Sequence, residues 1–292
     1  MRFYTIRRDG RELACASPCG KMLYPLPFAS SLNDLIVRGV PVDMETLKTL
    51  SETSKDPLFT PIPVEEADLL APIPHPLQDV VCLGLNYASH QAEAARFSEL
   101  AFGGERPYPI FFAKRVNTAP GPGGTIPSYP GLVEKLDYEC ELAVVLGRDA
   151  FQVAPENVKD YIFGYTVLND VSARTLQTRH KQWYFGKSLD GFTPMGPCIV
   201  TADEFAYPPA LPLRCLVNGE IRQDSNTENL ITTIDEIVSI LSQGMTLKAG
   251  TIIATGTPAG VGMGMQPPTF LQPGDVVECE IEGIGSLVNY VR

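Results

Sequence analysis

The stretch 136–145, Leu-Asp-Tyr-Glu-Cys-Glu-Leu-Ala-Val-Val, constrains the fold of this chain most strongly. Its side chains alternate with a period of two, which is typical of a β-strand. One face carries Tyr138, Cys140, Leu142 and Val144, and the other carries Asp137, Glu139, Glu141, Ala143 and Val145. The second face changes from acidic to apolar within a few residues, whereas a solvated face usually stays polar. We therefore expect a strand that enters a core with carboxylates at its edge.

Two of these carboxylates, Glu139 and Glu141, should lie about 7 Å apart on one face of the strand. Carboxylates this close repel one another unless a cation lies between them. Asp170, at the end of an apolar strand predicted at 162–168, is the candidate third carboxylate. Three carboxylates suit Mg²⁺, Mn²⁺ or Ca²⁺ when water or substrate oxygens complete the coordination. The alternatives are a wet acidic strand face and an Asp170 that caps a helix or turn.

Composition limits the function classes. The 292-residue chain is 44% hydrophobic and carries a formal net charge of -11, so it is globular and unsuited to binding nucleic acid. Its seven cysteines are scattered, and we expect them to be reduced in a cytoplasmic protein. The first eight residues lack the apolar segment of a signal peptide, and no apolar run has membrane-spanning length. No membrane partner is therefore expected.

The first 70 residues are predicted to form a small α/β unit. Strands are expected at 1–6 and 12–16 around an Asp9-Gly10 turn, with helices at 31–38 and after the N-cap Asp43. The proline-dense segment 70–76 is typical of an extended linker. We therefore predict a small N-terminal domain at 1–72, serving as a scaffold or dimer element, and a catalytic domain at 73–292.

The catalytic domain is predicted to be rich in strands. Strands are expected at 79–84, 109–114, 162–168, 251–255, 275–282 and 286–291, with a hairpin joining 213–217 to 220–222 through Asn218-Gly219. A helical stretch covers 87–100 and ends at Gly103-Gly104, a short helix covers 155–160, and an amphipathic helix covers 232–242. Strands and helices do not alternate regularly, so the fold class is α+β, mainly β.

His90 and Glu93 lie three residues apart in the predicted helix and share one of its faces. A histidine oriented by a carboxylate is an arrangement for a general base that activates water. Lys187, among small and aromatic residues, is suited to neutralising a substrate carboxylate or the acidic cluster. The alternatives are a solvated helix face for the first pair and an ordinary surface lysine for Lys187. No serine or cysteine has a convincing nucleophile setting.

Five motifs together resemble the fumarylacetoacetate hydrolase superfamily. They are Gly84-Leu85-Asn86-Tyr87-x-x-His90-x-x-Glu93, Asp137-Tyr138-Glu139-x-Glu141-Leu142-Ala143-Val144-Val145, Asn169-Asp170-Val171-Ser172-Ala173-Arg174-x-x-Gln177, Gly186-Lys187-Ser188-x-Asp190 and Thr255-Gly256-Thr257-Pro258-x-Gly260-Val261-Gly262. Their order and spacing match from about residue 80 to the C-terminus. The resemblance implies a catalytic domain built on a rolled mixed β-sheet, and the first 72 residues look like the small extra domain of longer members.

The resemblance also implies a site. Glu139, Glu141 and Asp170 would hold a divalent metal, most readily Mg²⁺ or Mn²⁺, with Ca²⁺ as a third candidate. His90 and Glu93 would belong to a lid that orders over substrate. The residues implied around a bound oxo-acid are Lys187, Arg174, Gln177, Lys114 and Thr257. Because longer members are dimeric, a homodimer is expected.

These expectations lead to a first functional hypothesis, a metal-dependent hydrolase that cleaves a C–C bond in a 2,4-dioxo acid such as an acylpyruvate or fumarylpyruvate. His90 would deprotonate the attacking water, and Lys187 would add positive charge near the enolate. The alternatives on the same site are decarboxylation of oxaloacetate or an oxo-tricarboxylate and isomerisation of 2-hydroxyhepta-2,4-diene-1,7-dioate. A different class is a non-catalytic module that binds dicarboxylates. Motifs shared across these activities do not choose between them.

Overall fold

The structure is a computed structural model that describes residues 1–96 and 108–292. Eleven strands of these described residues form one large mixed sheet, in the order β4-β3-β2-β1-β13-β11-β10-β16-β6-β7, with β5 also paired to β1. Its strands outside the N-terminal unit are β6 (Val80–Gly84), β7 (Ile110–Lys114), β10 (Cys140–Leu146), β11 (Ile162–Asn169), β13 (Met195–Thr201) and β16 (Ile252–Ala254). β16 and β6 are parallel and their other neighbours antiparallel, so the mixed, sheet-dominated fold class is confirmed.

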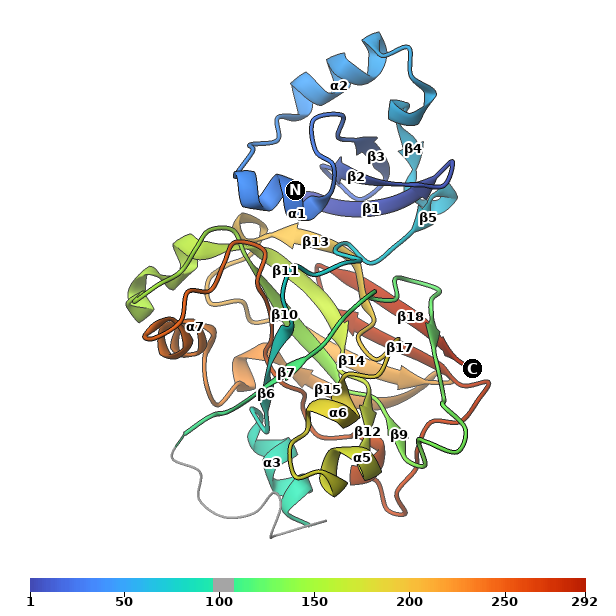
Figure 1. The fold of residues 1–292 in the computed structure, drawn as a ribbon, viewed down its shortest axis with the longest axis vertical. Helices are drawn as coiled ribbons and strands as arrows, with labels where there is room; N and C mark the ends of the chain where they lie inside the picture. Colours follow the sequence, from blue (N-terminus) through green and yellow to red (C-terminus); the bar gives the residue numbers. More distant parts are fainter. Residues whose placement is uncertain (97–107) are drawn as a thin grey trace.

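The N-terminal unit contains the two predicted strands and the two predicted helices, together with three short strands, β3, β4 and β5, that were not predicted. Its strands are β1 (Arg2–Arg8), β2 (Arg11–Ser17), β3 (Met22–Pro25), β4 (Ile62–Pro63) and β5 (Asp68–Leu69), and its helices are α1 (Leu32–Arg38) and α2 (Met44–Thr53). The Asp9-Gly10 turn has both φ angles positive, and Asp43 caps α2 as predicted. β1 also pairs with β13, so the unit extends the catalytic sheet (Figure 1). The domain boundary at 72/73 stays a prediction.

The stretch 136–145 forms two strands rather than one. β9 (Leu136–Asp137) pairs with β12 (Ser172–Ala173), while β10 begins at Cys140 and pairs with β11 and β16. The predicted alternation is confirmed, because Leu142 and Val144 belong to one buried cluster and Ala143 and Val145 to another. β10 therefore lies between two apolar layers, and its acidic end reaches the edge of the core.

A second sheet of five strands, all from residues after 120, has the order β15-β14-β17-β18-β8 within the described residues. Its members are β8 (Thr125–Ile126), β14 (Pro212–Val217), β15 (Glu220–Asn226), β17 (Val276–Ile281) and β18 (Gly285–Val291). The predicted Asn218-Gly219 hairpin and the closing strands are confirmed. The helix α7 (Ile234–Ser242) follows a capping box at Thr233, and the predicted helix at 155–160 is a 3₁₀ helix, Pro155–Tyr161.

Short helices gather at the end of the molecule opposite the N-terminal unit. They are α3 (Ala88–Ala95), α5 (Arg174–Arg179) and α6 (Tyr184–Lys187) (Figure 1). The predicted continuation of α3 to residue 100 and its end at Gly103-Gly104 lie outside the described residues. All seven cysteines are free, as predicted. Within the ranges described, no helix is long and apolar enough to cross a lipid bilayer.

Candidate active site

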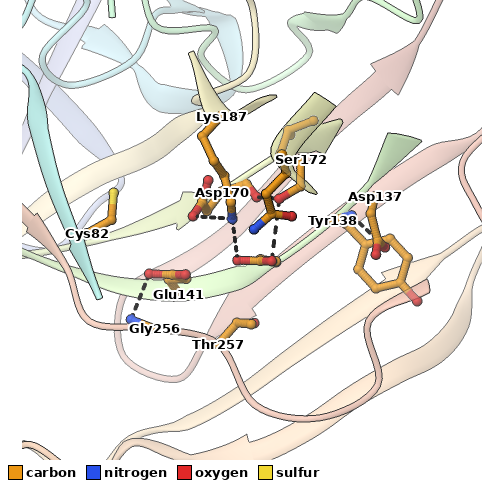
Figure 2. A network of polar contacts seen from close by, with 12 residues as sticks. Cys82, Asp137, Tyr138, Glu141, Asp170, Ser172, Lys187, Gly256 and Thr257 are labelled. Atoms are coloured by element: carbon orange, nitrogen blue, oxygen red, sulfur yellow. Dashed lines mark hydrogen bonds and ion pairs between the residues drawn. The ribbon is translucent and has the colours of Figure 1, made fainter. Parts of the chain in front are cut away.

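The three predicted carboxylates lie together where β10 begins beside the end of its neighbour β11. Glu139 immediately precedes β10, Glu141 lies within it, and Asp170 follows the last residue of β11. The strands are antiparallel, with Cys140 opposite Asn169, so the beginning of β10 lies beside the end of β11. One oxygen from each side chain lies within 4.8 Å of the other two. Figure 2 shows Glu141 and Asp170 on neighbouring strands.

Burial decides between the alternatives for this group. Glu141 and Asp170 are fully buried and Glu139 is 6% exposed, so a wet acidic strand face is wrong. Asp170 does not cap the following helix, because α5 starts after Ala173 without a side-chain cap. Its two oxygens instead accept hydrogen bonds from lysines. The three carboxylates therefore form a buried acidic cluster.

Two buried lysines neutralise part of this cluster. The Lys187 ammonium donates to Asp170 at 2.7 Å (Figure 2). It also donates to Glu139 at 2.8 Å. The Lys114 ammonium donates to the other oxygen of Asp170 and to the carbonyl of Val171. Lys187 is 1% exposed, so the surface-lysine alternative is wrong. Its ammonium contacts the acidic cluster, which is one of the two roles predicted for it.

Glu141 provides the test of whether a metal ion fits. Its Oε2 accepts a hydrogen bond from the Gly256 amide at 2.8 Å, but its buried Oε1 has no hydrogen-bond partner among the described residues. A buried polar atom without a partner is costly, and a cation beside it would remove that cost. Because oxygen donors are those that hard divalent cations prefer, the residues fit such an ion held by Glu139, Glu141 and Asp170.

The pKa values within the cluster shift in different directions. Burial, together with Asp170 and Glu139, raises the pKa of Glu141 well above its usual value. Burial acts the same way on Glu139, but Lys187 and Arg174 outweigh it and lower the pKa of Glu139. Burial alone would lower the pKa of Lys187, yet Asp170 and Glu139 raise it. Glu139 and Lys187 are therefore held in their charged forms as a pair.

A second ion-pair network lies beside the cluster and includes Asp137, for which no role was predicted. Arg174 donates through Nε to Asp137 at 2.8 Å, and through Nη1 to Glu139 and to Gln177. Its Nη2 is buried without a partner in the described part of the chain. Asp137 is fully buried and also accepts backbone N–H groups from Gly262 and Met263. The predicted Arg174 and Gln177 are thereby linked to Glu139.

His90 and Glu93 form the contact that their spacing predicts. His90 Nδ1 lies 3.1 Å from Glu93 Oε2, and the other oxygen of Glu93 accepts the Gly260 amide at 3.0 Å. The side chains are only 8% and 11% exposed, so a solvated helix face is wrong. An ionised Glu93 accepts the Nδ1 hydrogen, which leaves the lone pair on Nε2.

One pocket brings most of the predicted site residues together. It is lined by Leu83, Gly84, Leu85, His90, Ala94, Phe112, Glu139, Arg174, Gln177, Trp183, Lys187, Thr257 and Met263. Thr257 Oγ donates to the Cys140 carbonyl and accepts from Gln223. The fully buried Lys114 is not part of this wall and contacts Asp170 from elsewhere, so its placement does not support the predicted substrate contact.

Two residues of the pocket wall, Trp183 and Phe112, were not predicted to belong to the site. Trp183 packs against Gly84, where a Cβ atom would lie 2.3 Å from the indole ring. The ring centroids of Trp183 and Phe112 are 5.2 Å apart, and the ring planes meet at 66° in an edge-to-face contact. These residues form an apolar wall of the pocket. The single tryptophan in the chain, just before the Gly186-Lys187 motif, is the feature that could have indicated this wall.

Comparisons with known proteins agree with this architecture. Residues 79–292 match the family described as "Fumarylacetoacetate (FAA) hydrolase C-terminal". The chain is 42% identical to "Oxaloacetate tautomerase YisK" of Bacillus subtilis over 228 residues, which are 78% of this chain and 74% of that protein.

Solved structures that cover all of this chain are similar to it as well. A fumarylacetoacetate hydrolase from Exiguobacterium antarcticum is similar with a TM-score of 0.83 and 38% identity, over 99% of its own chain. A 2-hydroxyhepta-2,4-diene-1,7-dioate isomerase from Mycobacterium marinum has a TM-score of 0.73 and 31% identity, over 98% of its chain. The resemblance seen in the five motifs is confirmed, and the chain belongs to the fumarylacetoacetate hydrolase family.

Proposed function

We propose that this protein is a metal-dependent enzyme that interconverts the keto and enol forms of a small 2-oxo dicarboxylic acid, with oxaloacetate as the first candidate. The observation that carries this proposal is the pocket itself, whose wall combines His90 with the cationic groups of Lys187 and Arg174. Tautomerisation needs one base to move a proton and positive charge to stabilise the enolate. The pocket offers both, and it needs no nucleophile for this reaction.

Each polar residue of the pocket has a proposed role in this reaction. His90 Nε2 would hold the proton that C3 of the substrate loses or gains, while Glu93 fixes the ring through Nδ1. Arg174 Nη2, buried without a partner among the described residues, would donate to a substrate carboxylate. Lys187 would keep positive charge beside the enolate oxygen. Gln177 and Thr257, in the same wall, are proposed to orient the substrate.

Glu139, Glu141 and Asp170 are proposed as the metal ligands. An ion bound there would supply further positive charge to the carboxylate and carbonyl oxygens of the 2-oxo acid. Mg²⁺ and Mn²⁺ are the first candidates and Ca²⁺ the third, because all three accept carboxylate oxygens. The tautomerase proposal is supported by the 42% identity to a relative named as an oxaloacetate tautomerase.

Hydrolysis of a C–C bond in a 2,4-dioxo acid, the first hypothesis from the sequence, is the second candidate. The oriented His90 favours it, since the same Nε2 can deprotonate a water molecule. The structural similarity to a fumarylacetoacetate hydrolase also supports it. Decarboxylation and dienedioate isomerisation share the stabilised enolate and are further candidates on the same site. The His90–Glu93 pair argues against a module that only binds dicarboxylates.

A substrate panel tests the proposal. Protein stripped of metal and then supplied with Mg²⁺ or Mn²⁺ is assayed with oxaloacetate, an acylpyruvate and a hydroxydienedioate. We expect the ultraviolet absorbance of enol oxaloacetate to decay faster with the enzyme, at a higher kcat/KM than any acylpyruvate cleavage. If the protein cleaves an acylpyruvate but does not accelerate oxaloacetate tautomerisation, the tautomerase proposal is wrong and the hydrolase is supported instead. Binding of these acids without turnover of any would support the binding module instead.

A further inference from the structure

A short glycine loop contributes Met263 to the wall of the pocket. This loop, residues 260–264, includes the 3₁₀ turn Gly262–Gly264. On one side it contacts Glu93 of α3, and on the other it contacts Asp137 of β9. The loop overlaps the end of the last of the five motifs at residues 260–262, but the function proposed above assigns no role to residues 260–264.

Asp137 fixes one side of the glycine loop. Its oxygens accept the amides of Gly262 at 2.7 Å and Met263 at 3.0 Å. A Cβ atom on Gly262 would lie 2.6 Å from Asp137 Oδ1 and 2.3 Å from the carbonyl oxygen of Thr269, so there is no room for a side chain at this position. Through Arg174, the same carboxylate is linked to Glu139. This side of the loop is therefore anchored to the buried acidic cluster.

Glu93 contacts the other side of the loop. Its Oε1 accepts the Gly260 amide at 3.0 Å, and its Oε2 lies 3.1 Å from His90 Nδ1, so each oxygen has a partner among the described residues. A Cβ atom on Gly264 would lie 2.0 Å from Glu93 Oε1 and 2.1 Å from its Cδ. The Glu93 carboxylate therefore occupies the space that a side chain at position 264 would need.

We infer that the loop 260–264 positions the general base: Gly260 and Gly264 form a cradle for the Glu93 carboxylate, and Asp137 holds that cradle in register with the acidic cluster. Contacts run without a break from His90 through Glu93, the loop, Asp137 and Arg174 to Glu139. The position of the base on α3 is thereby set relative to the site on β10. Gly260, Gly264 and Asp137 are positioning residues, and their kinetic effect rests on the proposed function.

Gly264→Ala is a selective probe of the cradle. The three atoms nearest to the added methyl group all belong to Glu93, and they form the end of a flexible side chain that can move while the backbone stays. The backbone of Gly264 does not have a positive φ, so alanine is allowed there. Gly244→Ala is the matched control, because a Cβ at Gly244 meets nothing within 4 Å and its φ is also ordinary.

The kinetic test is a double-mutant cycle between Gly264 and Glu93. Gly264→Ala should lower kcat by about 10–100-fold, the usual effect of losing a carboxylate that orients a histidine. KM and metal affinity should stay unchanged, since the proposed metal ligands lie on other elements. In a Glu93→Ala background the methyl group has room, so Gly264→Ala should cause no further loss. Equal losses in both backgrounds would overturn the inference, and Gly244→Ala should match the wild type.

Hydrogen–deuterium exchange gives a readout that does not depend on turnover. Gly264→Ala should accelerate exchange of the α3 amides about 10-fold, because a hydrogen bond to a charged group that ties the helix down is lost. Gly244→Ala should leave α3 protection unchanged. Unchanged α3 exchange in Gly264→Ala would overturn the cradle. A wild-type protein that turns over no oxo-acid would refute the proposed function, while the exchange experiment would still decide the role of the loop.

Discussion

Glu141 differs from its acidic neighbours because it forms no ion pair in the described part of the chain. Asp170 contacts two lysines, and Glu139 contacts Lys187 and Arg174. Glu141 has only the Gly256 amide, and its other oxygen is unpartnered among the described residues. Burying a carboxylate in this way destabilises the metal-free fold, because nearby negative charge and burial both raise the pKa of Glu141 and disfavour its ionised form.

Glu141→Gln should therefore separate folding from metal binding. The isosteric amide removes the buried charge, so we expect the metal-free variant to melt at the same temperature as the wild type or higher. It should lose the rise in melting temperature that Mg²⁺ or Mn²⁺ gives the wild type, because metal affinity should fall at least about 100-fold. Thermal melting with and without chelator measures both effects. Glu156→Gln, at an exposed position, is the control and should melt and respond to metal like the wild type.

His90→Ala should separate the reactions of the site. Tautomerisation and any C–C hydrolysis should fall about 10²–10⁴-fold, which is the usual contribution of a positioned general base. Decarboxylation of oxaloacetate should persist. Loss of CO₂ forms the enolate directly, so this step removes no proton and needs no base. The comparison is made by measuring steady-state rates for both reactions. The rise in melting temperature on adding metal serves as the control for correct folding. A parallel loss of decarboxylation would indicate that His90 binds substrate and does not act as a base.

At the scale of single residues, local patterns indicated the three carboxylates that lie together in the buried acidic cluster, but not the ion pairs that surround them. The alternation at Glu139 and Glu141 and the strand end at Asp170 are local patterns, so they could be recognised. Whether Lys187 is exposed or buried depends on strands distant in the sequence, and only the fold decides it. Asp137 was placed on the acidic face, but its partners Arg174 and Gly262 are 37 and 125 residues away. No local pattern indicates such contacts.

At the scale of elements, caps and turns were the most predictable features. The cap at Asp43 and the turns at Asp9-Gly10 and Asn218-Gly219 depend on adjacent residues alone. The break between β9 and β10 was not predicted. It arises because the Tyr138 amide donates to the Asp137 side chain and the Glu139 amide donates to the Asn169 side chain, 30 residues away. Side-chain acceptors thus replace the sheet ladder at the point where the acidic cluster begins.

The capping box of α7 gives a test at this scale. The Thr233 hydroxyl accepts the Glu236 amide, and the Glu236 carboxylate accepts the Thr233 amide. Thr233→Ala should lower the free energy of unfolding by about 1 kcal/mol, the usual contribution of such a cap. Thr233→Ser keeps the hydroxyl and should lose little. Urea unfolding of both variants measures the difference, and equal destabilisation by alanine and serine would contradict the role of the cap.

At the scale of the whole molecule, the N-terminal unit and the catalytic domain share one sheet through the pairing of β1 with β13. The sequence divides them at the proline-dense segment near residue 72, because composition changes there. No local sequence pattern indicates pairing between strands that are so far apart in the chain. The shared sheet could therefore not be predicted from the sequence. Side chains from both parts also contribute to the same buried clusters.

The predicted homodimer is tested at the same scale. The second sheet begins at the edge strand β15, where the apolar side chain of Ile221 is 52% exposed. The unpaired backbone groups of an edge strand can pair with another copy of the chain, and an exposed isoleucine on that strand favours such a contact. Analytical ultracentrifugation at micromolar concentration should give twice the 31.8 kDa of the chain. Ile221→Glu should shift this equilibrium toward monomer, and a monomeric wild type would refute the prediction.

The central claim, that Glu139, Glu141 and Asp170 hold a metal ion on which enol chemistry depends, is tested most directly by metal titration of turnover. Stripped wild-type protein is titrated with Mn²⁺ while the decay of enol oxaloacetate is followed. We predict that activity is absent in chelator, rises with added metal and saturates at one ion per chain, and that Glu141→Gln stays inactive throughout. Full activity of the stripped protein in chelator, or wild-type activity in Glu141→Gln, would contradict the claim.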